Sequence, residues 1–239
     1  MASRGVILFA VLGAFYLSGV QSGLVTRCKT EDTKCAKESA QAMIAPFAAG
    51  IPEYNVKTLD PVTFKRVDAS SPNLKLILTD ITITGLKDTI VKKVKRDKSK
   101  NKMFLKFVSS VQLEGNYEMK GQLLILSMEG KGPLHVTLRK AEFSVEVDIF
   151  DIEKDGKTYW DARDWKYSYA LKDKSDVEFE NLFDGNEDLA NAAREIIKEN
   201  GNEIIMEVGT PMIDATMKEV FADVKSMFHT LSADQLSLD

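Results

Sequence analysis

The sequence predicts an α+β fold in which a highly curved antiparallel sheet wraps around a long C-terminal helix. Helix-forming residues fill the segment from Asp32 to about Ala45, apolar and polar residues alternate from Leu74 to about Phe179, and a helical period begins near Asn186. Neighbouring strands that are joined by short turns favour antiparallel pairing. Because the sheet and the last helix each have apolar residues to bury, we expect them to pack against each other.

The composition is that of a folded globular protein. Of the 239 residues, 44% are hydrophobic and 28% are charged, and 32 Lys and Arg residues stand against 36 Asp and Glu residues. The net charge of -4 is spread along the chain, which disfavours nucleic acid as a partner because phosphate binding needs a basic surplus. Two histidines and two cysteines are too few for a recognisable zinc or iron-sulfur site, so we expect no metal and no cofactor.

The N-terminal segment has the residue order of a secretory signal peptide. Arg4 precedes an apolar run at residues 6–17, and small or polar residues follow as far as Gly23. We therefore expect residues 1–22 to be removed as a signal peptide and residues 23–239 to form a single secreted, extracellular domain. A membrane anchor is the alternative, but about a dozen apolar residues fall short of the roughly 20 that cross a bilayer.

Cys28 and Cys35 are the only cysteines, and an oxidising compartment predicts a disulfide between them. A redox-active pair is the alternative, but such pairs normally have C-x-x-C spacing. The short helix that follows has Asp32 or Thr33 available as its N-cap, and Pro46 is expected to end it.

The predicted strands have an apolar side and a polar side. Residues 74–83 alternate, but the phase shifts across Thr79-Asp80, which predicts a β-bulge. Asp155-Gly156 lies between two strand-like runs and is the best hairpin signal in the chain. The other expected strands are two within residues 104–126, around Gly115 or Gly121, and those at residues 134–138, 141–149 and 165–171.

Residues 87–102 are rich in lysine, and only Asp88 and Asp97 oppose the basic side chains. Such a patch can draw a protein to an anionic membrane surface or to another protein. A solvated strand end and loop is the simpler interpretation, which we favour because the chain is acidic overall.

The C-terminal third has apolar residues at a period of about 3.6 residues. Gly209-Thr210-Pro211 interrupts this pattern, so we expect a kink or a break there. Apolar residues lie on more than one side of the helix, so the sheet must cover most of its circumference. The two can pack as a solid core, or they can leave a cavity for an apolar ligand.

Several methionines on this helix favour the cavity, because their flexible side chains suit varied apolar ligands. The candidate residues for its lining are Ile196, Ile204, Ile205, Val208, Met212, Met217, Val220, Phe143, Val145 and Val136. Tyr117, Tyr167 and Tyr169 are candidate polar anchors because a phenol joins an apolar ring to a hydrogen-bonding tip. Ordinary strand aromatics are the alternative role for these tyrosines.

Catalytic motifs are not found in the sequence. It has no G-x-S-x-G elbow, and neither His135 in a strand nor His229 near the end of the last helix has a local partner that suggests catalysis. We therefore expect no catalytic residues and no enzyme activity.

Six motifs follow one another at characteristic positions: Cys28 with Cys35, Gly50-Ile51-Pro52, Ile81-Thr82-Ile83-Thr84-Gly85-Leu86, Gly115-Asn116-Tyr117 with Gly121, Gly130-Lys131-Gly132-Pro133, and Asn181-Leu182-Phe183-Asp184-Gly185-Asn186. In this order and spacing the chain resembles the insect takeout and juvenile hormone binding protein family, over nearly its whole length. Moth haemolymph carriers of juvenile hormone have a second disulfide between the sheet and the last helix. This chain has no cysteine after Cys35, so it is nearer to the takeout branch.

The resemblance implies a tubular lipid-binding fold with an internal tunnel. It implies a non-enzymatic, monomeric carrier of juvenile hormone, another terpenoid or an acyl-chain lipid in insect haemolymph or sensory fluid, with a circadian connection and transient contact with a membrane or receptor. The alternative function is an extracellular protein- or membrane-interaction module without a bound ligand, and an esterase acting on such lipids is a third.

Overall fold

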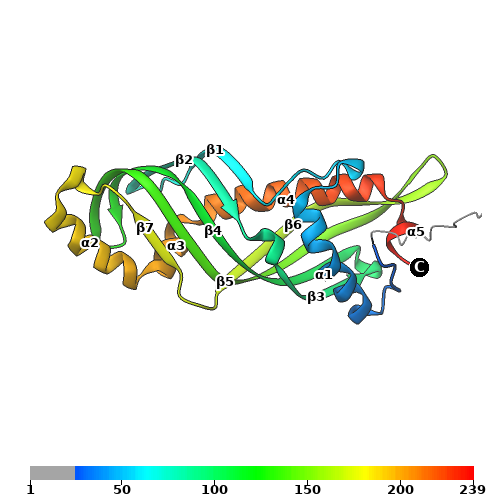
Figure 1. The fold of residues 1–239 in the computed structure, drawn as a ribbon. Helices are drawn as coiled ribbons and strands as arrows, with labels where there is room; N and C mark the ends of the chain where they lie inside the picture. The colour runs from blue at the N-terminus through cyan, green and yellow to red at the C-terminus, as the bar shows by residue number, and fades with distance from the viewer. Residues whose placement is uncertain (1–24) are drawn as a thin grey trace, which may run out of the picture.

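The computed structural model describes residues 25–239 and shows an elongated molecule, in which one curved antiparallel sheet extends along a chain of helices (Figure 1). The predicted signal peptide, residues 1–22, lies outside the described residues. The strands are β1 (Val62–Asp68), β2 (Leu74–Thr84), β3 (Ile90–Asp97), β4 (Lys102–Leu123), β5 (Leu126–Lys154), β6 (Lys157–Leu171) and β7 (Asp176–Phe179). The α-helices are α1 (Thr33–Ala49), α2 (Glu187–Glu199), α3 (Gly201–Val208), α4 (Thr210–Thr230) and α5 (Ala233–Leu236).

Two long strands, β4 and β5, form the centre of the sheet. They pair from Lys102 opposite Asp148 to Leu123 opposite Leu126. The other edge of β4 is shared by β3 and β2, and the other edge of β5 is shared by β6 and β7. The predicted α+β class and the curved antiparallel sheet are confirmed.

Register shifts interrupt the strand pairing at several places and help the sheet to curve. The shift between Thr79 and Thr82 confirms the predicted bulge, and Asp80 has a left-handed backbone there, with φ of 51°. Asp155-Gly156 is the turn between β5 and β6, as the hairpin signal predicted.

The predictions for several strands were wrong. Residues 104–123 belong to one strand, because the ladder with β5 continues through both Gly115 and Gly121. Residues 134–149 likewise belong to a single, longer strand. The strand β1 was not predicted, and the Lys-rich stretch contains the eight-residue strand β3.

The helix α1 begins as predicted and ends later than predicted. The Asp32 side chain accepts a hydrogen bond from the Cys35 backbone N–H, which confirms Asp32 as the N-cap. Pro46 lies inside the helix, because a proline removes one helical hydrogen bond without preventing the next residues from staying helical. The helix ends at Gly50, whose φ of 91° an L side chain rarely adopts.

The C-terminal helical region is divided at two positions. The break at Gly209 was predicted, whereas the break at Asn200 was not. A Cβ on Gly201 would lie 2.2 Å from the Ser175 carbonyl oxygen, so the close approach of this helix to the loop before β7 requires glycine. No helix within residues 25–239 is both long and apolar enough to span a membrane.

Candidate ligand-binding cavity

An apolar cavity of about 500 Å³ lies between the sheet and the helices. Its wall includes Ile204 on α3, Met212 and Phe228 on α4, and Leu236 on α5. These helices follow one another along the molecule, with α3 and α5 near opposite ends (Figure 1). The cavity is therefore elongated, and its wall includes Trp165 of β6 and Phe221 of α4, which stack on each other with ring centroids 5.3 Å apart.

Nine of the ten candidate lining residues lie at this wall. They are Val136, Phe143 and Val145 on β5, Ile204, Ile205 and Val208 on α3, and Met212, Met217 and Val220 on α4. Ile196 is the exception, because it lies on α2 and does not line the cavity. The inward-facing side chains of β5 and the apolar side chains of α3 and α4 thus line the same cavity.

The three candidate tyrosine anchors lie elsewhere. Tyr117 is buried beside Phe179, and its hydroxyl donates a hydrogen bond of 2.6 Å to the Glu180 carbonyl oxygen. The Tyr167 hydroxyl donates to a carboxylate oxygen of Asp214 at 2.5 Å. Tyr169 has its hydroxyl 3.5 Å from that of Thr210, and none of the three tyrosines lines the cavity.

Burial raises the pKa of two of these tyrosines, Tyr117 and Tyr167. Burial raises the pKa of Tyr117 to about 12. Burial and the Asp214 carboxylate both raise the pKa of Tyr167. Their hydroxyls join elements of the fold, so we do not retain them as anchors.

The polar group that the sequence interpretation missed is Arg96. It is on β3, it lines the cavity, and only 9% of its surface is exposed. Burial lowers the pKa of the guanidinium, and the nearby Asp151 carboxylate opposes this effect. The available signal was its position two residues after Val94, on the same side of the strand.

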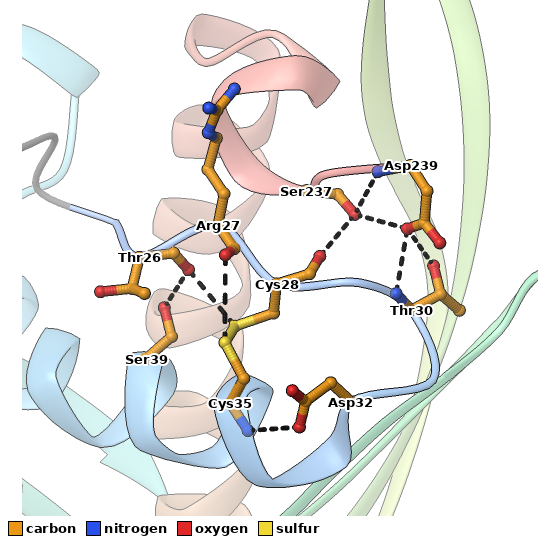
Figure 2. Close-up of a disulfide and its surroundings, with 9 residues drawn as sticks. All are labelled: Thr26, Arg27, Cys28, Thr30, Asp32, Cys35, Ser39, Ser237 and Asp239. Carbon is orange, nitrogen blue, oxygen red and sulfur yellow. Dashed lines mark hydrogen bonds between the residues drawn. A yellow bond between two sulfur atoms is a disulfide. The ribbon is translucent and has the colours of Figure 1, made fainter.

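The end of the cavity near α5 is covered by the two terminal segments. Cys28 and Cys35 form the predicted disulfide (Figure 2). The Ser237 hydroxyl donates to the Cys28 carbonyl oxygen at 3.0 Å, and the Thr30 N–H donates to the Asp239 carboxylate at 2.9 Å. Because Cys28 and Ser237 both line the cavity, the disulfide loop and the C-terminus form part of its wall.

The helix α1 forms another part of the wall, through Met43 and Phe47. The sequence interpretation assigned the wall to the sheet and the last helix alone. The contribution of both terminal regions of the described chain to the cavity wall was not predicted. A helical apolar pattern does not specify which element the apolar side of the helix will contact.

The two histidines lie outside the cavity lining. His135 has its Nε2 atom 3.3 Å from a Glu180 carboxylate oxygen, and His229 has its Nε2 atom 2.9 Å from an Asp161 carboxylate oxygen. Within residues 25–239, no group of three or more His, Cys, Asp or Glu side chains is arranged to hold a metal ion.

A curved sheet and helices that enclose an elongated apolar cavity define a protein of the hydrophobic-ligand-binding class. A sequence model of the haemolymph juvenile hormone binding protein family matches residues 6–238, and the chain belongs to this family. The family resemblance seen in the sequence motifs is therefore confirmed.

Individual relatives agree with this assignment. The chain is 25% identical over 222 residues to the circadian clock-controlled protein daywake of Drosophila melanogaster, covering 87% of this chain and 85% of that protein. It is 28% identical over 89 residues to the juvenile hormone-binding protein of Manduca sexta, covering 36% and 39% of the two chains. The crystal structure of Epiphyas postvittana takeout 1 has the same fold, with a TM-score of 0.86 at 23% identity and coverage of 89% and 99%.

Proposed function

We propose that this protein is a secreted, non-enzymatic carrier that binds a lipophilic small molecule in the cavity between α4 and the sheet. Residues 1–22 would serve as the signal peptide, and residues 23–239 would form one ligand-binding domain that acts as a monomer. The observation that supports this proposal most directly is the apolar cavity of about 500 Å³. Small-molecule sites typically enclose about 300–1,000 Å³.

The magnitudes are sufficient for useful affinity. Burying about fifteen carbons contributes roughly 12 kcal/mol at ~0.8 kcal/mol per methylene. Association costs at least ~4 kcal/mol, which leaves at most ~8 kcal/mol, or an affinity of about micromolar at best. Membership of a family named for a juvenile hormone binding protein is consistent with a terpenoid or acyl-chain ligand.

Filling the cavity tests the proposal. Met212 is buried at the cavity wall, so Met212→Trp should place an indole in the space that the ligand needs. We expect this variant to bind the neutral fluorophore N-phenyl-1-naphthylamine about tenfold or more weakly, which corresponds to ~1.4 kcal/mol. Fluorescence titration of the purified protein measures the affinity.

Met206→Trp is the matched control, because Met206 is on α3 but is 53% exposed and does not line the cavity. It should bind the fluorophore like the wild type. Ile204→Trp provides a second obstruction if Met212→Trp loses its far-UV circular dichroism signal. Unchanged uptake by a folded Met212→Trp or Ile204→Trp variant would contradict binding at this site.

A further inference from the structure

Arg96 is a basic residue on the apolar, inward side of β3. Its neighbours on that side, Val91 and Val94, are buried and line the cavity. The lysines at positions 92, 93 and 95 are exposed on the opposite side of the strand. The side chain of Arg96 is only 6% exposed, so the guanidinium has been taken out of water and brought to the cavity wall.

Within residues 25–239 this guanidinium has incomplete polar partners. Its Nη2 atom lies 3.8 Å from a carboxylate oxygen of Asp151, whose side chain is 55% exposed. Its carbon Cζ lies 5.4 Å from the centre of the Trp160 ring. The Nε and Nη1 atoms are buried and donate no hydrogen bond to any described residue. A buried charge with unused donors is costly unless a partner supplies the missing acceptor.

The charged residues of the cavity wall all have the same sign. Among the described residues that line the cavity, the ionisable side chains are Lys29, Arg96 and Lys106, and there is no Asp or Glu. Lys106 has a carboxylate partner, since its Nζ atom lies 3.0 Å from Glu142. The cavity therefore combines an apolar wall with a buried guanidinium whose one carboxylate neighbour, Asp151, lies outside the lining.

We propose that the ligand is a long-chain carboxylate, whose carboxylate group accepts hydrogen bonds from the guanidinium of Arg96 while its hydrocarbon chain occupies the cavity. This inference rests on the proposed carrier function and specifies the chemical class of the cargo. A carboxylate suits this guanidinium in two ways: it supplies one negative charge beside the buried cation, and its oxygens accept hydrogen bonds from the unused N–H donors. A phosphate monoester carries close to two charges and would leave one of them without a partner at a single guanidinium.

The position of Arg96 also gives the ligand a direction. Trp160, beside the guanidinium, packs edge-on against Phe228 near the C-terminal end of α4. Lys98, two residues after Arg96, has its Nζ atom 3.8 Å from the carboxylate of the C-terminal residue Asp239. The carboxylate would thus lie at the end covered by the terminal segments, and the chain would extend along α4 toward Ile204 on α3.

The experiment compares an acid with its neutral ester. Oleate and methyl oleate have the same hydrocarbon chain, and each is titrated against protein loaded with N-phenyl-1-naphthylamine at neutral pH. The wild type should bind oleate about tenfold to a hundredfold more tightly than methyl oleate, as expected for a hydrogen bond to a charged group. Arg96→Met should abolish this preference by weakening oleate binding, with methyl oleate changed by less than about threefold. Arg96→Lys, which keeps the charge, should retain part of the preference.

Two variants are matched controls for the removal of a cation. Arg163→Met removes a guanidinium that pairs with Asp161 at 2.8 Å, lies over the Phe150 ring and does not line the cavity. Lys95→Met removes an exposed cation next to Arg96 on the outward side of β3, which does not line the cavity. Both should keep the preference for oleate.

Equal wild-type affinities for oleate and methyl oleate would overturn the assignment of a carboxylate ligand. A preference that survives in Arg96→Met, or is lost in Lys95→Met instead, would overturn the role of Arg96. These outcomes differ from failure of the carrier function itself, in which the wild type would bind neither the fluorophore nor either lipid.

Discussion

Arg96 was missed in the sequence because its neighbourhood is dominated by charge. Lysines on both sides gave the whole stretch the appearance of a solvated surface. The strand β3 also has a register shift between Val91 and Lys93, which separates its inward valines by three residues instead of two. Alternation counted from Val91 therefore places Arg96 on the outer side, and only the two-residue step from Val94 indicates that it faces the interior. This orientation determines the proposed ligand class.

The one buried polar residue of α4 could not be recognised from the apolar pattern either. Asp223 is on α4 and is only 1% exposed, and its carboxylate accepts a hydrogen bond of 3.1 Å from the Lys57 backbone N–H. Burial raises the pKa of Asp223, and the nearby Glu219 also raises it, whereas Lys57 opposes the shift. The charged carboxylate is thus less favourable in the folded state than in the unfolded chain.

This pKa direction predicts how Asp223→Asn changes stability with pH. Because the folded state holds the Asp223 proton more tightly, the wild type loses stability as pH rises from the unfolded pKa of Asp to the raised folded pKa. The amide keeps an acceptor for Lys57 and does not titrate. Urea unfolding at a series of pH values should therefore show that the free energy of unfolding of the variant increases relative to that of the wild type as pH rises from about 3.9.

Above the folded pKa of Asp223 the difference between the two proteins should become constant. A difference between Asp223→Asn and the wild type that is independent of pH would show that burial does not control this carboxyl group.

At the scale of elements, the sequence predicted whether a segment is a helix or a strand better than it predicted how long each element is. Gly115 and Gly121 suggested turns, yet they pair with Leu134 and Met128 in a part of the ladder that has no register shift. A glycine in a strand can mark a turn or a close approach of two chains, and the local pattern does not distinguish them. By contrast, the hairpin at Asp155-Gly156 was predictable because two residues with the right backbone preference joined two strands.

The disulfide could be predicted from the sequence, but its place in the cavity wall could not. The contacts of this loop with Ser237 and Asp239 join residues that are 209 positions apart in the sequence, and no local pattern specifies such a pairing. The two termini thus stabilise each other at the end of the cavity where Arg96 lies.

Removing this disulfide should loosen the terminal cover. The double variant Cys28→Ser and Cys35→Ser should lower the free energy of unfolding by roughly 2.5 kcal/mol in the chain-entropy account of a loop of about eight residues. Amide hydrogen exchange should also accelerate around Thr30 and Leu238, whose N–H groups donate across the two termini.

Ser237→Ala is the comparison for this variant, since it removes one hydrogen bond between the termini and keeps the covalent link. It should accelerate exchange less than the double variant does. If unfolding midpoints and exchange rates of the double variant equalled those of the wild type, the disulfide would have no role in holding the cover.

At the scale of the whole molecule, apolar periodicity predicted that the sheet and helix would face each other. It could not determine whether they touch. Met212 and Phe143 would have the same inward positions in a solid core and at the wall of a cavity, so the space between them depends on the curvature of the long strands. Register shifts help to produce this curvature. The shift between Thr79 and Thr82 was visible in the sequence, whereas the shift between Ser109 and Val111 was not.

The most direct test of the carrier account is a crystal structure of the protein soaked with dibrominated stearate. We predict anomalous bromine peaks between α4 and the inner side of the sheet, with the carboxylate group within hydrogen-bond distance of Arg96. An interior filled by side chains, with bromine peaks only on the outer surface, would contradict the account.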